Sequence, residues 1–111
     1  MKQGDIIWLG FDPAKGREQA GYRPALVISN TKYNQKRDFA IVCPITSKGR
    51  ALKLQVSLDD RTHTQGSVIC EQVKTIDLLS RTHKVIESIP KDLLKKVLEI
   101  VSVIISLGDD E

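Results

Sequence analysis

The chain divides into a succession of short segments with strand composition followed by one helical segment, and this pattern limits the folds open to it. The expected strands are residues 5–11, 23–29, 38–45, 51–57, 66–77 and 83–87. They are rich in β-branched residues or alternate apolar with polar ones, and turn residues bound them. Residues 31–35 are expected to form a helical turn or a loop. So many short strands in 111 residues predict a mainly β fold, either a small, partly open barrel or a strongly bent antiparallel sheet.

The C-terminal segment predicts a helix that covers this sheet. Pro90 suits the first helical position, and Gly108 can close the end. Between them, apolar residues recur at helical spacing, namely Leu93, Leu94, Val97, Leu98, Val101, Ile104 and Ile105. Ile100, Val103 and Leu107 widen the apolar surface beyond one stripe. The helix therefore packs either against the sheet alone or also against a second subunit.

The length of the chain suffices for one hydrophobic core, so we expect a single domain over residues 1–111. No apolar run reaches the roughly 18 residues that span a bilayer, and no segment resembles a signal peptide. We therefore expect an intracellular protein that does not enter a membrane. Cys43 and Cys70 lie in apolar runs, without Cys or His nearby at metal-ligand spacing. We interpret them as buried free thiols, with a disulfide between them as the open alternative.

Basic residues are concentrated in the first half of the chain. Residues 1–57 carry ten Lys and Arg against four Asp and Glu, a net charge of +6, whereas residues 58–111 carry seven against ten, a net charge of −3. Such an asymmetry indicates an anionic partner, although a solvated basic surface gives the same pattern. Charge alone therefore does not identify nucleic acid as the partner.

The run from Glu18 to Pro24 has the character of a functional site. It places the carboxylate of Glu18 and the guanidinium of Arg23 five residues apart in a long polar connection between two expected strands. Gly21 leaves the backbone between them open to close approach. The alternative is an ion pair that anchors the loop, but exposed ion pairs add little stability. We interpret Glu18 and Arg23 as a site.

Four blocks of sequence together resemble one protein family. In order, they are Gly4–Trp8 with Asp12-Pro13 and Lys15-Gly16; Glu18–Pro24; Pro44–Ser47; and Glu71–Asp77. With the closing helix they span nearly the whole chain, and the second and fourth blocks are the specific ones. On these residues the chain resembles the toxins of the MazF/PemK/Kid family.

The resemblance implies a fold and an activity. The implied fold is an SH3-like β-barrel of the CcdB/PemK/MazF type with a C-terminal helix, assembled as a homodimer. The implied function is that of a toxin of a type II toxin-antitoxin system, an endoribonuclease (mRNA interferase) that cleaves single-stranded mRNA at short sequences and inhibits translation and growth. The family needs no metal or other cofactor. A cognate MazE/PemI-like antitoxin holds such toxins inactive in the cytoplasm.

The resemblance also assigns roles by position. Glu18 and Arg23 fall where the family keeps its catalytic acid and arginine, and Thr46 falls where it keeps a hydroxyl near the scissile phosphate. Arg17 departs from some members, which have histidine at this position, and Glu71 stands where some members use an acidic residue in the fourth block. The sequence does not decide whether Glu71 takes part in catalysis.

The chemistry of metal-free RNA cleavage assigns similar roles to these side chains. The 2′-hydroxyl attacks the adjacent phosphorus, which requires a base, positive charge for the phosphorane and a donor for the leaving 5′-oxygen. Glu18 is the natural base. Arg23 stabilises charge, because a guanidinium group stays protonated and is a poor proton donor. Thr46 can donate to a non-bridging oxygen, and the general acid remains unassigned. The products would carry 2′,3′-cyclic phosphate and 5′-hydroxyl ends.

RNA binding also needs a path for phosphates and platforms for bases. The candidate residues are Lys15, Arg17, Lys48, Arg50 and Lys74 for phosphates, Tyr22 for stacking, Gln19 and Gln72 for base edges, and Ser47 and Glu71 beside the catalytic groups. Trp8 is a further aromatic candidate, but it sits in an apolar strand, and we expect it in the core.

Two other functions compete with the nuclease. A gyrase inhibitor of the CcdB type would share the barrel, but its members resemble one another at a Trp-containing C-terminus that this chain lacks. A non-catalytic RNA-binding module would use the basic surface, with Glu18 in a structural role. Cleavage, binding without cleavage, or inhibited DNA supercoiling would separate the three.

Overall fold

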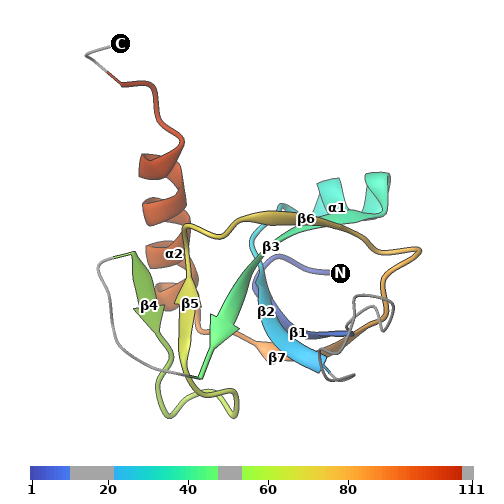
Figure 1. The fold of residues 1–111 in the computed structure, drawn as a ribbon, viewed down its shortest axis with the longest axis horizontal. Coiled ribbons are helices and arrows are strands. Elements are labelled where there is room, and N and C mark those ends of the chain that lie inside the picture. Colours follow the sequence, from blue (N-terminus) through green and yellow to red (C-terminus); the bar gives the residue numbers. More distant parts are fainter. Residues whose placement is uncertain (11–21, 48–53, 109–111) are drawn as a thin grey trace, which may run out of the picture.

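One antiparallel sheet and two helices make up the part of the chain that the structure describes, residues 1–10, 22–47 and 54–108 of a computed structural model (Figure 1). In chain order the elements are β1 (Asp5–Gly10), β2 (Tyr22–Val27), α1 (Thr31–Arg37), β3 (Phe39–Thr46), β4 (Gln55–Ser57), β5 (Ser67–Ile69), β6 (Lys74–Asp77), β7 (His83–Ser88) and α2 (Lys91–Ile104). A mainly β fold with a C-terminal helix is therefore confirmed.

The long strand β3 organises the sheet. The strand order is β4-β5-β3-β2-β1-β7, with β6 also paired to β3. Val42 pairs with Val27 of β2 and also with Lys74 of β6, so β2 and β6 lie on opposite edges of β3. Farther along β3, Ile45 pairs with Val68 of β5. One edge of β3 therefore takes β2, and the other takes β6 and then β5.

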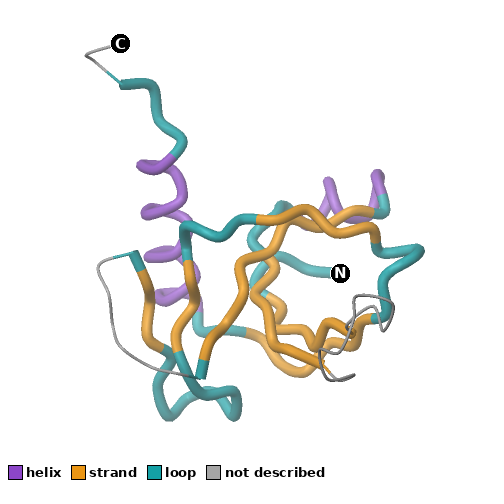
Figure 2. The backbone as a smooth tube through the Cα atoms, viewed as in Figure 1, coloured by secondary structure: helices purple, strands orange, loops and turns teal. Residues whose placement is uncertain are grey.

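The two faces of the strands bury separate apolar clusters. Ile6, Leu26 and Cys43 belong to the first, which packs against Leu93 and Val97 of α2. The neighbouring side chains point the other way, and they form the second cluster with residues of β3 and β6: Ile7, Leu9, Ala25, Val27, Ala40, Val42 and Ile76. Figure 2 shows the strands curving, with α2 standing to one side of them. Both faces of the strands are therefore apolar.

The prediction of one strand over residues 66–77 is wrong, because two strands, β5 and β6, occupy this range. Between Val68 and Lys74 the chain advances six residues, whereas their partners Ile45 and Val42 on β3 are three residues apart. The surplus forms a turn after β5, closed by the Gln72 N–H donating to the carbonyl of Ile69 at 3.3 Å. Residues 70–73, named here the β5–β6 excursion, therefore lie outside the pairing with β3. Local composition did not reveal this turn, because the register against β3 creates it.

The helices differ from expectation mainly at their ends. Residues 31–35 belong to a true helix, α1, because the Asn30 side chain caps it by accepting from the backbone N–H of Lys32 at 2.8 Å. The C-terminal helix ends at Ile104, earlier than the expected end near Gly108. The N–H and the hydroxyl of Ser106 both donate to the carbonyl of Val103, which closes the last turn. None of the described helices is long and apolar enough to cross a bilayer.

The two cysteines are buried free thiols, as expected. Cys43 and Cys70 face each other within the first cluster, where the Cys43 thiol lies 3.9 Å from the carbonyl oxygen of Cys70. Burial, with a smaller contribution from the neighbouring Cys70, raises the pKa of Cys43 to about 12. Both thiols therefore act as small apolar side chains at neutral pH.

The loop between β4 and β5 is fixed to two other elements through charged side chains. Arg61 forms ion pairs with Asp59 at 2.8 Å and with Asp92 of α2 at 2.9 Å. Glu87 of β7 accepts hydrogen bonds from the backbone N–H groups of His63 and Thr64 at 3.0 and 2.8 Å, and from the Thr64 hydroxyl at 2.7 Å. The exposed ion pairs contribute little free energy, so Glu87 is the stronger anchor.

Glu87 should give a stability that is lost in acid. Burial acts to raise its pKa, but the hydrogen bonds from Thr64 and His63 outweigh burial and hold the pKa of Glu87 below its usual value. The stabilisation is therefore complete above the unfolded-state pKa of about 4.3 and disappears as the pH falls through the lower folded-state pKa. Urea titrations from neutral into acidic pH should show Glu87→Gln with a lower free energy of unfolding at neutral pH and a shallower acid decline.

Thr64→Ala is the graded companion of this test. It removes only the hydroxyl donor, so its effect on the acid decline should have the same sign as that of Glu87→Gln and be smaller. An acid decline of equal steepness in the wild type and Glu87→Gln would contradict the role of this carboxylate.

Candidate active site at one end of the sheet

Two strand ends meet where β2 begins and β3 finishes. Ala25 pairs with Pro44 in antiparallel register, so the start of β2 lies beside the last residues of β3. β5 pairs with the same end of β3 through Thr46 and Ser67. The β5–β6 excursion follows directly and brings Gln72 to the same end of the sheet. Residues distant in sequence are thus gathered by strand pairing alone.

A pocket of about 420 Å³ opens at this meeting point. The described residues that line it are Arg23, Pro24, Pro44, Ile45, Thr46, Ser47, Ile69 and Gln72. We name it the Arg23–Thr46 pocket. A guanidinium, two hydroxyls and an amide stand beside prolines and isoleucines, so donors with fixed geometry adjoin an apolar surface. Such a lining suits a ligand with both anionic oxygens and a flat apolar part.

A second pocket of about 340 Å³ adjoins the first and shares Arg23, Pro24, Pro44 and Gln72 with it. Its remaining described lining is Leu9, Ala25, Val42, Val73, Lys74 and Arg81. We name it the Lys74–Arg81 pocket. Three cationic side chains thus line the two pockets, and none of their described lining residues is acidic. Their summed field attracts an anion.

Arg81 is held in place by the end of β1. Its Nε donates to the carbonyl of Gly10 at 3.0 Å, and its backbone N–H donates to the carbonyl of Asp77 at 2.9 Å. Gly10 in turn donates its N–H to the carbonyl of Thr82 at 2.9 Å. The turn between β6 and β7 is therefore fastened to β1, and Arg81 is positioned at the pocket by backbone contacts.

Gly66 allows β5 to pair closely with Thr46 at the end of β3. Its backbone has φ +121°, a conformation that side chains rarely adopt. A Cβ at this position would lie 2.0 Å from the carbonyl oxygen of Thr46. Only glycine therefore lets β5 pair with β3 at Thr46, which couples the conformation of the β4–β5 loop to the Arg23–Thr46 pocket.

The structure brings together several of the residues expected from the sequence. Ser47 and Gln72 join Arg23 and Thr46 in the first pocket, and Lys74 lines the second. Glu71 is exposed on the β5–β6 excursion and is not part of the described lining of either pocket. Six further candidates lie outside the described residues: Lys15, Arg17, Glu18, Gln19, Lys48 and Arg50.

Sequence reasoning missed Arg81 and misplaced Trp8. No local motif marks Arg81, because its place depends on the pairing of β7 with β1. Trp8 was expected in the core, but it is 37% exposed while the rest of β1 is buried. Alternation along β1 places Trp8 on the face of Ile6, beyond the part of that face covered by α2. Tyr22 is also exposed and lines a separate pocket with Trp8 and Lys84.

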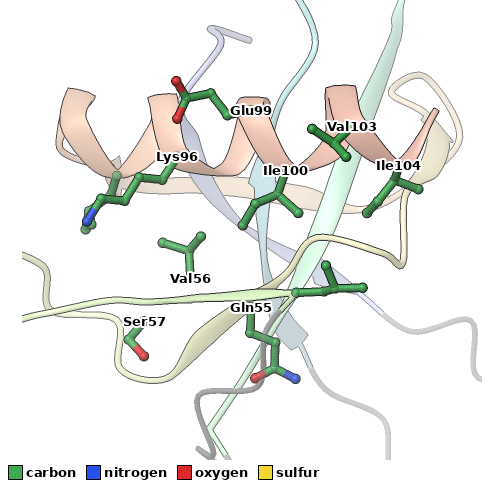
Figure 3. A pocket seen from close by; sticks show the side chains of 10 residues that line it. Gln55, Val56, Ser57, Lys96, Glu99, Ile100, Val103 and Ile104 are labelled. Atoms are coloured by element: carbon green, nitrogen blue, oxygen red, sulfur yellow. The ribbon is translucent and has the colours of Figure 1, made fainter. Parts of the chain in front are cut away.

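A groove lies away from these pockets, between α2 and β4. It has a volume of about 560 Å³, and its described lining is Leu54, Gln55, Val56, Ser57, Leu93, Lys96, Glu99, Ile100, Val103 and Ile104. Figure 3 shows Ile100 and Ile104 of α2 pointing toward β4, whereas Glu99 points away from this strand. We name it the α2–β4 groove. Its largely apolar lining suits packing rather than phosphate chemistry.

The described residues contain no cluster of three or more His, Cys, Asp or Glu side chains that could hold a metal ion. The described chemistry of the site is that of hydrogen-bond donors and cations: the Arg23 and Arg81 guanidinium groups, the Lys74 ammonium group, and the Thr46 and Ser47 hydroxyls. These groups can bind phosphate oxygens and stabilise added negative charge.

Known proteins of one family match this chain over almost its whole length. The model of the family of PemK-like, MazF-like toxins of type II toxin-antitoxin systems matches residues 2–105. Endoribonuclease PemK of Escherichia coli is 36% identical over 110 residues, covering 96% of this chain and 83% of PemK. Endoribonuclease EndoA of Bacillus subtilis (strain 168) is 32% identical over 114 residues, covering 98% and 97%. The crystal structure of MazE-MazF (Form-II) from Deinococcus radiodurans matches with a TM-score of 0.88 at 30% identity, covering 97% of both chains.

Gly66→Ala should destabilise the fold and disturb Thr46. The positive φ alone costs about 1–3 kcal/mol for a residue with a Cβ, and the clash with the Thr46 carbonyl adds to it. Urea unfolding should report at least this loss, and amide NMR spectra should show the largest shift changes near Thr46 and Ser67. Gly108→Ala, at an exposed position beyond α2, is the matched control. Equal stability of the two variants would contradict the steric role of Gly66.

Proposed function

We propose a function for this chain from one premise: it belongs to the PemK-like, MazF-like family of toxins of type II toxin-antitoxin systems. The chain is an endoribonuclease that cleaves single-stranded mRNA at short sequences, without a metal ion, and so inhibits translation and growth. The observation that carries this proposal is the shared pocket of Arg23 and Thr46, next to the cations Lys74 and Arg81.

The reaction is a transfer of the phosphoryl group to the neighbouring 2′-hydroxyl. Glu18 takes the proton of this hydroxyl as its oxygen attacks the phosphorus. Arg23 donates to the phosphate oxygens and stabilises the negative charge of the phosphorane, and the Thr46 hydroxyl donates to a non-bridging oxygen. The bond to the 5′-oxygen then breaks and this oxygen takes a proton from a general acid or from water, leaving a 2′,3′-cyclic phosphate and a 5′-hydroxyl. Ser47 and Gln72 bind the nucleotides that flank this phosphate, a role supported by their position in the lining of the same pocket.

The wider architecture is proposed on the same basis. Residues 1–111 form one domain with an SH3-like barrel, which acts in the cytoplasm. Its activity is restrained by a cognate antitoxin of the MazE or PemI type, whose acidic, partly disordered tail covers the cationic pockets and folds on binding. The structure of the Deinococcus radiodurans relative is a MazE-MazF complex, which supports a partner of this kind. Competition between such a tail and RNA for the toxin would test this occlusion.

Catalysis is tested with purified protein and a long single-stranded RNA of mixed sequence in EDTA, followed by mapping of the cut ends. The wild type should cut at one short motif and leave cyclic phosphate ends. Glu18→Gln and Arg23→Ala should each reduce the rate by roughly 10²-fold or more, with little change in melting temperature. Arg37→Ala is the control for Arg23→Ala, because it removes the same positive charge from the exposed end of α1, and it should cleave RNA like the wild type.

Other outcomes have clear meanings. Full activity in Arg23→Ala would remove that residue from the mechanism. Intact RNA with retained RNA binding would leave a non-catalytic module, and intact RNA with inhibited DNA supercoiling would indicate a gyrase inhibitor instead.

The chain is also proposed to form a homodimer through α2. The α2–β4 groove is largely apolar, and past it the end of α2 and the following residues project from the sheet, with Ile105 and Leu107 76% and 95% exposed (Figure 1). A twofold interface needs one surface that is complementary to itself. A groove beside a projecting apolar segment meets this need, because each copy can place its helix end against the groove of the other.

Sedimentation equilibrium tests this assembly. The wild type should have twice the 12.4 kDa mass of one chain, and Ile105→Glu combined with Leu107→Glu should be monomeric at the same concentration. Leu79→Glu is the matched control, because Leu79 is 80% exposed, lies in the β6–β7 turn and is not among the described residues that line the groove. A monomeric wild type, or a control as dissociated as the double variant, would contradict the proposed interface.

A further inference from the structure

The only tryptophan of the chain stands out from its own strand. Trp8 is 37% exposed, whereas the other residues of β1 are buried. Tyr22, at the first position of β2, is 48% exposed. Burying Trp8 would have stabilised the fold, so its exposure leaves a large flat apolar surface available for a ligand.

Strand register brings Trp8 to a second aromatic residue and to a cation. Trp8 pairs directly with Lys84 of β7, and Tyr22 pairs with Gly10, two residues farther along β1. All three side chains therefore leave the sheet on the same face. Gly10 places no side chain between Tyr22 and Trp8. The three are the described residues that line a pocket of about 400 Å³, named here the Trp8–Tyr22–Lys84 pocket.

We propose that the Trp8–Tyr22–Lys84 pocket binds one nucleotide of the single-stranded RNA, outside the two nucleotides that the cleaved phosphate joins. Aromatic side chains are the usual platforms for unstacked bases, and they accept any base because every base has a flat face. Lys84 supplies the charge for the adjoining phosphate. None of the described lining is acidic. This inference rests on the proposed nuclease function and extends its substrate path.

The pocket and the candidate active site are linked by consecutive residues of β2. Tyr22 and Arg23 are consecutive, so their side chains point to opposite faces of the sheet. Because Tyr22 is the first residue of β2, both side chains lie at the same end of this strand. An RNA chain in the Arg23–Thr46 pocket need only pass over this strand end to place its next base against Tyr22 and Trp8. The cations already present at this end of the sheet favour RNA over an apolar protein segment as the occupant.

The intrinsic fluorescence of Trp8 tests the proposal directly. The probe is a single-stranded oligoribonucleotide with 2′-O-methyl groups throughout, which blocks attack by the 2′-hydroxyl, and total binding is followed by calorimetry. Trp8 emission should be quenched along the same saturation curve as the calorimetric signal. Tyr22→Ala should weaken binding roughly tenfold, the scale of one lost base-stacking contact. Tyr22→Phe should retain affinity, and Lys84→Gln should lower both the affinity and its salt dependence.

Matched controls separate stacking and charge from general surface effects. Tyr33→Ala removes an exposed tyrosine from α1, and Lys91→Gln removes an exposed lysine from the start of α2. Both should bind the oligonucleotide like the wild type.

Two failures are distinguishable. Constant Trp8 emission at saturating RNA, with Tyr22→Ala binding like the wild type and cleavage still dependent on Arg23, would overturn the proposal and leave the nuclease function standing. Absence of both RNA binding and cleavage would overturn the nuclease function, and this proposal with it.

Discussion

The double pairing of β3 is the constraint on which the rest of the structure depends. One edge of this strand holds β2 in a register that brings Arg23 close to Thr46, and the other edge holds β6 and then β5. The chain from Val68 to Lys74 is three residues longer than the stretch of β3 with which its ends pair. The β5–β6 excursion therefore leaves the sheet, and Gln72 comes to lie in the Arg23–Thr46 pocket. The glycine at position 66 permits the last of these pairings. The site is therefore a product of backbone hydrogen bonding, with side chains added at the strand ends.

Charge at the site comes from both halves of the chain. Arg23 belongs to the basic first half, whereas Lys74 and Arg81 belong to the half with net negative charge. The asymmetry along the sequence therefore indicated an anionic partner without locating where the charge gathers. What locates it is the pairing of β7 with β1, which carries Arg81 to the carbonyl of Gly10. A phosphate chain drawn to these cations would meet Arg23 at the junction of the two pockets.

Local patterns predicted most of the elements, and nonlocal contacts decided the rest. The apolar spacing in α2 and the β-branched strands was sufficient for a mainly β fold with a terminal helix. The break within residues 66–77 was not predictable, because those residues read as continuous strand and only the register against β3 interrupts them. Trp8 was misjudged for a related reason: a strand with apolar residues on both faces gives no sign of where α2 stops covering one of them. Arg23, Thr46, Ser47 and Gln72 were found because motif blocks contain them, whereas Arg81 and Lys84 stand outside any recognisable motif for a site.

The central claim is that RNA chemistry takes place where β2 begins and β3 ends. Titration of ¹⁵N-labelled protein with the non-cleavable oligoribonucleotide, followed by amide NMR, tests this placement most directly. The account predicts the largest shift changes at Arg23, Thr46, Ser47 and Gln72, with smaller changes in α2. Shift changes concentrated in the α2–β4 groove, with these four amides unmoved at saturation, would contradict it.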